Sequence, residues 1–241
     1  MSAHQPAANE DADRSGRRIP ATRPVRRAAT IALLRDGDGA AEVYLLRRAA
    51  SMAAAAAMHV FPGGGVEPID GPAEDAGTTL AAAIRELAEE TGVELPASPV
   101  PVRFARWITP EGLPVRHDTD FFAVALPGDQ SPTLIGTEAD IGEWCQPTDA
   151  LADAATGRIG LLPPTWAALQ LLAGHADVSA TLSALRERNI AHLALMPRRR
   201  QEEDGTSRWV LNDVLTGDDI TDPTELGLPA GWQPIPPGLD R

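Results

Sequence analysis

The stretch RELAEETGV, at residues 85–93, is the part of the chain that decides its fold. Its three glutamates, Glu86, Glu89 and Glu90, are spaced i, i+3 and i+4, so on a helix they project from one face. Three like charges on one patch repel one another, which costs stability unless a cation lies against them. Carboxylate oxygens in this number suit Mg²⁺ or Mn²⁺. The alternative is a glutamate-rich helix face that is simply solvated.

The residues around this stretch predict a helix over 79–91. Apolar side chains recur there at helical spacing, and Thr78 or Thr79 can cap the start. Gly92 is placed to end the helix as a C′ glycine. Ahead of the helix, the sequence FPGGG closes a short apolar segment. Glycines there let the backbone approach a ligand or metal closely, which favours a binding site over a solvated face.

The rest of the chain predicts a mixed α/β domain with a helical C-terminal part. A turn at residues 36–39 joins the first two apolar runs into a β-hairpin. The predicted strands are at residues 28–35, 41–48, 58–61, 102–108, 121–126, 142–146 and 207–211, and the further helices are at 147–155, 163–172 and 177–188.

Composition limits the classes of function. A net charge of −13 argues against binding a nucleic-acid duplex, which depends on Lys and Arg neutralising phosphates. An acidic protein that handles polyphosphates also needs metal cations or a local basic cluster. No apolar run approaches the roughly 20 residues that cross a bilayer, so we expect no membrane partner. The single cysteine, Cys145, excludes an internal disulfide, and a cytoplasmic location is the default.

The glycines of FPGGG and the stretch RELAEETGV together resemble the Nudix box, G-x5-E-x7-R-E-U-x-E-E-x-G-U, in which U is apolar. The first half departs from that pattern, since Asp70 stands where the family has glutamate. Fourteen residues then separate Asp70 from Arg85 instead of seven, so Glu74 or Asp75 is the alternative partner for the arginine. The second half fits at Arg85, Glu86, Leu87, Glu89, Glu90, Gly92 and Val93.

The resemblance implies a Nudix-like α/β/α sandwich with a mixed β-sheet and additional C-terminal helices. It implies metal-dependent hydrolysis of a phosphoanhydride bond in a nucleoside diphosphate linked to another group. Mg²⁺ or Mn²⁺ would be held by Glu86, Glu89 and Glu90, with a backbone carbonyl near Gly63 or Gly64 assisting. Either Glu89 or Glu138 would be the base, and Arg85 would support a carboxylate.

The lengthened box loop is similar to that of coenzyme A diphosphatase-like proteins. Their signature is poorly met, because Ala53 and Ala57 replace its second arginine and its glycine. Coenzyme A-like, NADH-like and dinucleoside polyphosphate substrates therefore all stay open. The resemblance implies that Arg48, Phe61 and Arg116 bind the substrate. His117, Asp118 and Asp120 follow Arg116 and could line the cleft with it. For Arg116 and these three residues, packing or turn formation at a strand end is the alternative.

The expected organisation is a disordered tail at residues 1–27, a Nudix domain at 28–196 and a C-terminal extension at 197–241. The expected partner is a nucleotide-type small molecule, and a homodimer is left open. A catalytically weak nucleotide-binding or regulatory domain is the alternative function, supported mainly by the altered front of the box. The three intact glutamates argue against it, because a binding module needs no mutually repelling carboxylates.

Overall fold

The computed structural model describes residues 25–222 and 224, apart from 53–54, 73–74, 112, 114, 189, 202–204, 206, 221 and 223. The expected tail up to residue 24 therefore lies outside the described residues, as do Ala53, Glu74 and the chain beyond 224. Among the helices described, none is long and apolar enough to cross a membrane.

The described strands form one mixed sheet, in the order β11-β10-β9-β5-β6-β1-β2-β3-β8, with β4 on β1 and β7 on β2. The strands are β1 (Arg26–Asp36), β2 (Ala41–Arg48), β3 (Met58–Val60), β4 (Gly63–Gly65), β5 (Val102–Ile108), β6 (His117–Ala125), β7 (Ala139–Cys145), β8 (Gly160–Leu161), β9 (Leu195–Gln201), β10 (Ser207–Asp213) and β11 (Asp219–Ile220).

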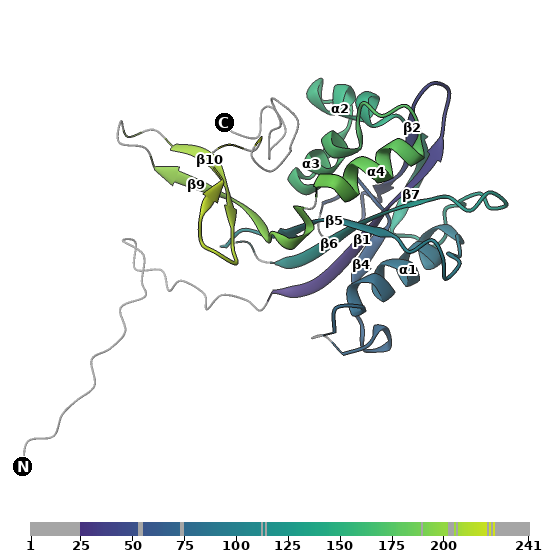
Figure 1. The fold of residues 1–241 in the computed structure, drawn as a ribbon, viewed down its shortest axis with the longest axis horizontal. Coiled ribbons are helices and arrows are strands. Elements are labelled where there is room, and N and C mark those ends of the chain that lie inside the picture. The colour runs from purple at the N-terminus through teal and green to yellow at the C-terminus, as the bar shows by residue number, and fades with distance from the viewer. Residues whose placement is uncertain are drawn as a thin grey trace, which may run out of the picture.

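The helices of the described residues cover this sheet on its two faces, as Figure 1 shows with α1 on one side and the others opposite. Alternate residues of β1 serve the two layers: Ile31 and Leu33 pack with α1, while Ala32 and Leu34 pack with the other helices. The α/β sandwich expected from the sequence is thereby confirmed. The helices are α1 (Thr78–Thr91), α2 (Pro147–Ala155), α3 (Pro163–Leu172) and α4 (Val178–Arg188), with short 3₁₀ turns at Pro68–Asp70 and Ile190–His192.

The centre of the sheet is the parallel pair β1 and β6, whose register runs from Arg26 opposite His117 to Leu34 opposite Ala125. The other edge of β1 is shared. Its first half pairs with the glycine strand β4, and its last residues pair with β2. Since β4 leads through the box loop to α1, this division brings the glycines and the glutamate helix to the same edge.

Several boundaries differ from those expected. Gly63–Gly65 forms a strand, although glycine disfavours strands, because it pairs with Ala28–Thr30 of β1. The strand β1 includes Arg26 and Arg27, which the sequence placed in the tail. The strand β6 begins at His117 instead of residue 121, because its acidic side chains are buried against arginines. The strand β9 was missed, and it crosses the 196/197 boundary between the expected domain and extension.

Candidate active site

The helix α1 starts differently from the expectation and ends as expected. Neither Thr78 nor Thr79 caps it, since Gly77 occupies the cap and both threonines are helical. The Thr79 hydroxyl instead donates to Asp120 at 2.7 Å, and the Thr78 hydroxyl donates to the Pro72 carbonyl at 2.6 Å. The other end closes at Gly92, in the left-handed conformation that glycine tolerates, with its N–H on the Ala88 carbonyl.

Arg85 donates hydrogen bonds to several residues of the box. Its Nε and Nη2 donate to the two oxygens of Asp70 at 2.9 and 3.0 Å, a bidentate pair. Its Nη1 donates to Glu86 at 3.0 Å and to Glu89 at 3.1 Å, and Nη2 also reaches the Gly65 carbonyl at 3.0 Å. Asp70 thus occupies the place of the family's glutamate towards the arginine. We call Asp70, Arg85, Glu86 and Glu89 the box cluster.

The 3₁₀ turn Pro68–Asp70 explains how a side chain one methylene shorter than glutamate reaches Arg85. Asp70 accepts the Glu67 N–H at 2.8 Å, so the turn fixes its carboxylate next to the helix. The carboxyl group is almost fully buried, with 2% of the side chain exposed. The adjacent Arg85 guanidinium lowers the pKa of Asp70 below its usual value, so the acid is charged at neutral pH.

The glycine strand permits a close approach between backbone and carboxylates. The Gly63 N–H donates to Glu90 at 2.8 Å. A Cβ at position 64 would collide with the carboxylate of Glu86. At Gly63, where φ is 155°, a Cβ would collide with the backbone of β1. Only glycine therefore fits at position 63, whereas a side chain at position 64 would displace the Glu86 carboxylate from its place.

Burial and mutual repulsion raise the pKa values of two glutamates, Glu86 and Glu90, above their ordinary values. Desolvation raises the pKa of Glu90 to about 7; the Gly63 N–H opposes this shift, and the charges of Glu86 and Glu138 add to it. Desolvation also raises the pKa of Glu86, against the influence of Arg85. Buried carboxylates of this kind are stabilised by any cation that approaches them.

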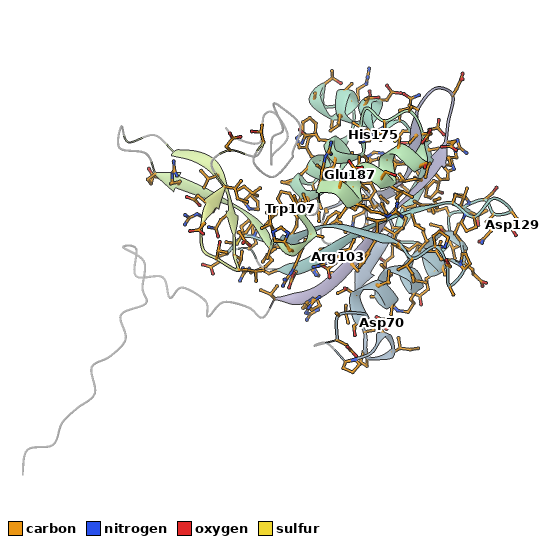
Figure 2. All side chains as sticks on the ribbon, in the orientation of Figure 1. Asp70, Arg103, Trp107, Asp129, His175 and Glu187 are labelled. Atoms are coloured by element: carbon orange, nitrogen blue, oxygen red, sulfur yellow. The ribbon has the colours of Figure 1, made fainter. Side chains whose placement is uncertain are left out.

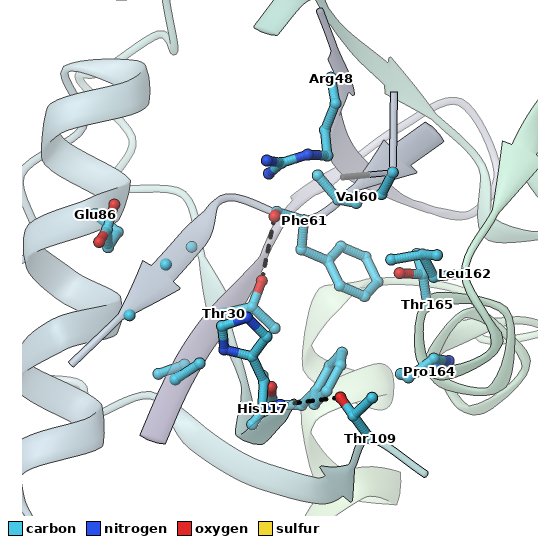
Figure 3. A pocket seen from close by; sticks show the side chains of 18 of the residues that line it. Thr30, Arg48, Val60, Phe61, Glu86, Thr109, His117, Leu162, Pro164 and Thr165 are labelled. Carbon is cyan, nitrogen blue, oxygen red and sulfur yellow. Dashed lines mark hydrogen bonds between the residues drawn. The ribbon is translucent and has the colours of Figure 1, made fainter. Parts of the chain in front are cut away.

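A cavity of about 510 Å³ opens beside this cluster. Figure 3 shows Glu86 on its helix at one side, Arg48 above, and Phe61 and His117 between the helix and Pro164. The Thr30 hydroxyl, in the cavity wall, donates to the carbonyls of Phe61 and Pro62 at 3.2 and 2.7 Å and so fixes the chain before the glycines. Phe61 packs edge-on against Phe121 with ring centroids 6.3 Å apart.

The structure brings most of the predicted site residues to this cavity. Arg85, Glu89 and Glu90 do not line it. Arg85 donates to Glu86 in the wall and to Glu89, and Glu90 accepts the N–H of Gly63 in the wall. Arg116 is absent from the wall; it is buried, and its Nε donates to the Thr109 carbonyl at 3.0 Å. The predicted residues that line the cavity are Arg48, Phe61, Gly63, Gly64, Glu86, Glu138 and His117.

Sequence reasoning missed four threonines of the wall, Thr30, Thr109, Thr119 and Thr165. The signal for Thr30 was present, because it is the one hydroxyl within the otherwise apolar run at residues 28–34. Thr109 and Thr165 lie at the end of a strand and the start of a helix, where a hydroxyl is ordinarily explained by capping or turn formation.

The acidic residues beside Arg116 serve the sheet instead of the cavity. Arg106 holds Asp118 by two hydrogen bonds of 2.7 Å. Arg103 Nε donates to Asp120 at 2.9 Å, and Arg27 donates to the other oxygen of Asp120 at 3.2 Å. For these two acids the packing alternative is therefore the better interpretation. We call Arg27, Arg103, Arg106, Asp118 and Asp120 the sheet cluster.

The residues at the box fit a divalent cation by their chemistry and charge. Five carboxylates and two arginines lie there. The atoms that the carboxylates offer as metal ligands are hard oxygens, which Mg²⁺ and Mn²⁺ prefer. Within the described part of the chain, no three such side chains already stand together as ligands. Glu86 and Glu89 turn towards Arg85, and Glu90 turns towards Gly63. The groups counted are Asp70, Glu86, Glu89, Glu90 and Glu138 with Arg48 and Arg85.

The comparison with protein families decides the assignment. The family model described as NUDIX domain matches residues 25–164, more than half of the chain. The chain belongs to the Nudix family. Members of this family generally need divalent metals, which agrees with the acidic character of the box. The match does not single out the coenzyme A diphosphatase-like subgroup. Among curated proteins, no match is found.

A similar solved structure supports the Nudix fold. The NUDIX hydrolase from Alicyclobacillus acidocaldarius is 25% identical, with a TM-score of 0.60 over 66% of this chain and 96% of its own. The MutT NUDIX hydrolase from Burkholderia pseudomallei is 20% identical, with a TM-score of 0.46 over 61% and 96% of the two chains. The NUDIX domain of Shewanella oneidensis NrtR, complexed with ADP ribose, is 16% identical, with a TM-score of 0.45 over 69% and 89%. The family match and the first of these structures support a hydrolase.

Proposed function

We propose that this Nudix chain hydrolyses a phosphoanhydride bond in a nucleoside diphosphate linked to another group, with Mg²⁺ or Mn²⁺ as cofactor. One observation carries the proposal: two carboxylates, Glu86 and Glu138, share the wall of a 510 Å³ cavity with Arg48. Carboxylates of this kind suit the metal, and the arginine suits a phosphate. The cavity is large enough for part of a nucleotide.

The residues take distinct parts in the proposed reaction. Glu86, Glu89 and Glu90 would hold the metal, and Arg85 with Asp70 would orient the first two. When bound, such an ion would offset phosphate charge and lower the pKa of the attacking water. Glu138 is better placed than Glu89 to accept the proton of that water, because Glu138 lines the cavity whereas Glu89 accepts from Arg85. Attack on one phosphorus breaks the anhydride and leaves a phosphate on each product.

The alternative of a catalytically weak binding domain loses its main argument from sequence. That argument was the altered front of the box, yet Asp70 forms the bidentate pair with Arg85 in spite of the longer loop. The charge of the site also favours an enzyme, since buried glutamates with raised pKa values are costly in a module that only binds.

A panel assay tests the proposal. Purified chain with Mg²⁺ or Mn²⁺ is incubated with coenzyme A, NADH, ADP-ribose, diadenosine polyphosphates and nucleoside triphosphates, and the products are separated by chromatography. We expect turnover of at least one diphosphate compound, lost in Glu90→Gln and Glu138→Gln. The matched control is Glu94→Gln, an exposed glutamate just beyond α1. No turnover on any compound, with micromolar nucleotide binding retained, would establish the binding domain instead.

A further inference from the structure

The peptide group between Pro62 and Gly63 is held at both of its polar ends. Its carbonyl oxygen, on Pro62, accepts the Ile31 N–H at 2.9 Å and the Thr30 hydroxyl at 2.7 Å. Its N–H, on Gly63, donates to Glu90 Oε2 at 2.8 Å. Because a peptide group is planar, the bonds that fix its carbonyl also fix the direction of its N–H. The hydroxyl of Thr30 is thereby linked to Glu90 through one peptide group.

Thr30 is the one side chain that holds this carbonyl among the described residues, and it is 9% exposed. The same hydroxyl lies 3.2 Å from the Phe61 carbonyl, a contact that Figure 3 draws. Since a hydroxyl has a single proton, the nearer carbonyl of Pro62 is the better acceptor. A Cβ at Gly63 would lie only 2.8 Å from the Thr30 Cβ, so the glycine and the threonine are closely packed. This packing limits rotation of the peptide while the hydroxyl bond is intact.

Glu90 depends on this peptide for its orientation. The Gly63 N–H is its hydrogen-bond donor within the described part of the chain, whereas Arg85 donates to Glu86 and Glu89. The bond engages Oε2 and leaves the other carboxylate oxygen for a cation. A carboxylate that is already oriented loses less conformational freedom when it binds, so its ligand is bound more tightly.

We propose that Thr30 is a positioning residue of the metal site, whose hydroxyl holds the Pro62–Gly63 peptide so that the Gly63 N–H keeps Glu90 oriented for a divalent cation. The inference rests on the proposed function, in which Glu90 is a metal ligand. Partners that orient a metal ligand typically change metal affinity or activity by about ten- to a hundredfold. A hydroxyl that contacted the substrate directly would change KM instead.

Three variants isolate the hydroxyl. Thr30→Val keeps the branched shape and removes the donor, and Thr30→Ser keeps the donor. The matched control is Thr181→Val on α4, because the buried Thr181 hydroxyl also donates to a backbone carbonyl, that of Asp177 at 2.9 Å, in the helical layer. Circular dichroism and thermal denaturation establish that each variant is folded.

Mn²⁺ binding to the substrate-free protein tests the metal site without turnover, with free Mn²⁺ measured by electron paramagnetic resonance. We expect the Kd to rise about tenfold in Thr30→Val and to stay within about threefold in Thr30→Ser and Thr181→Val. An unchanged Kd in Thr30→Val would overturn the inference. Equal weakening in Thr181→Val, or no Mn²⁺ binding by the wild type, would also overturn it.

Hydrogen exchange of the Gly63 amide in the metal-free protein tests the peptide link itself. We expect exchange to be about tenfold faster in Thr30→Val than in the wild type, and within about threefold in Thr30→Ser, because a peptide that is free to turn exposes its N–H. Equal exchange in Thr30→Val and the wild type would refute the link.

Steady-state kinetics with Mg²⁺ separates the inference from the proposed function. On a compound that the wild type hydrolyses, Thr30→Val should lower kcat about tenfold and leave KM within about twofold. A raised KM with unchanged kcat would make Thr30 a substrate contact and overturn the positioning role. No turnover of any compound, with Mn²⁺ affinity lowered in Thr30→Val alone, would refute the hydrolase and retain the inference. Turnover with equal Mn²⁺ affinity in Thr30→Val and the wild type would do the reverse.

Discussion

The box cluster and the sheet cluster both join arginines to carboxylates next to α1, but their charge balance is opposite. In the box cluster, three carboxylates share the single arginine Arg85. In the sheet cluster, three arginines surround Asp118 and Asp120. Figure 2 labels one member of each, Asp70 in the loop before α1 and Arg103 on the sheet. An excess of negative charge indicates a site for a cation, whereas aspartates that are paired with arginines indicate a structural role.

Glu86→Gln tests the assignment of the box cluster as a cation site, and we expect this variant to have the largest effect. We expect turnover to fall about a thousandfold, because a proposed metal ligand is lost. The free energy of unfolding of the metal-free protein should stay equal or rise, because a repelling charge is removed from a buried position. Steady-state kinetics and urea denaturation measure the two quantities. A clear loss of stability would show that the box cluster is structural.

Asp120→Asn should produce the opposite pattern. We expect the free energy of unfolding to fall by about 3 kcal/mol, the low end for a broken buried pair, because Arg103 keeps part of its side chain exposed. The activity of the molecules that stay folded should fall less than tenfold. Chemical denaturation checks this, with Asp129→Asn in an exposed turn as the matched control. Equal stability of the two variants would contradict the assignment of the sheet cluster.

Asp70→Asn tests the link between the box loop and the glutamates. Removing the charge that holds Arg85 should lower kcat ten- to hundredfold, the usual effect of losing an orienting partner of a metal ligand. Asp75→Asn changes an exposed acid of the same loop and should leave kcat unchanged. The reverse result would mean that the insertion acid supports the arginine in solution.

The pH dependence of the free energy of unfolding tests the burial of Glu90. Burial raises the pKa of Glu90 to about 7 from its ordinary value of 4.5, so the folded chain binds this proton more tightly than the unfolded chain. Its stabilising contribution is fully present below about pH 4.5 and is lost as the pH rises through 7. Without metal, wild type should lose roughly 3 kcal/mol across this window relative to Glu90→Gln. Parallel denaturation profiles of the two proteins would refute the buried, proton-binding state.

The secondary structure on both sides of the box was largely predictable. The helix α1 was placed within one residue, because apolar spacing and Gly92 act locally. The pairing of Gly63–Gly65 with β1 was not predictable, because the glycines have no strand propensity of their own and depend on a partner 35 residues away. The strand β9 was missed for a related reason. It contains Pro197 and three arginines, and Arg198 and Arg200 find their common partner Asp219 only in the folded chain.

For the site, residue type and spacing identified the glutamates and glycines but not the direction of each side chain. Arg116 and His117 are neighbours in sequence, and alternation along the chain sends one into the interior and the other into the cavity wall. The choice between Asp70 and the insertion acids also depended on a 3₁₀ turn that brings the shorter side chain to Arg85. Such choices are made by tertiary contacts, which a local pattern does not contain.

The position of Asp70 ahead of the inserted residues separates loop length from site geometry. Since the arginine is held from the turn at Pro68–Asp70, residues 71–77 need only return the chain to the start of α1. Doubling the length of such a segment adds only about 0.6 kcal/mol of closure entropy. The connection can therefore lengthen or shorten over evolutionary time while the acid, the arginine and the glutamates keep their mutual positions.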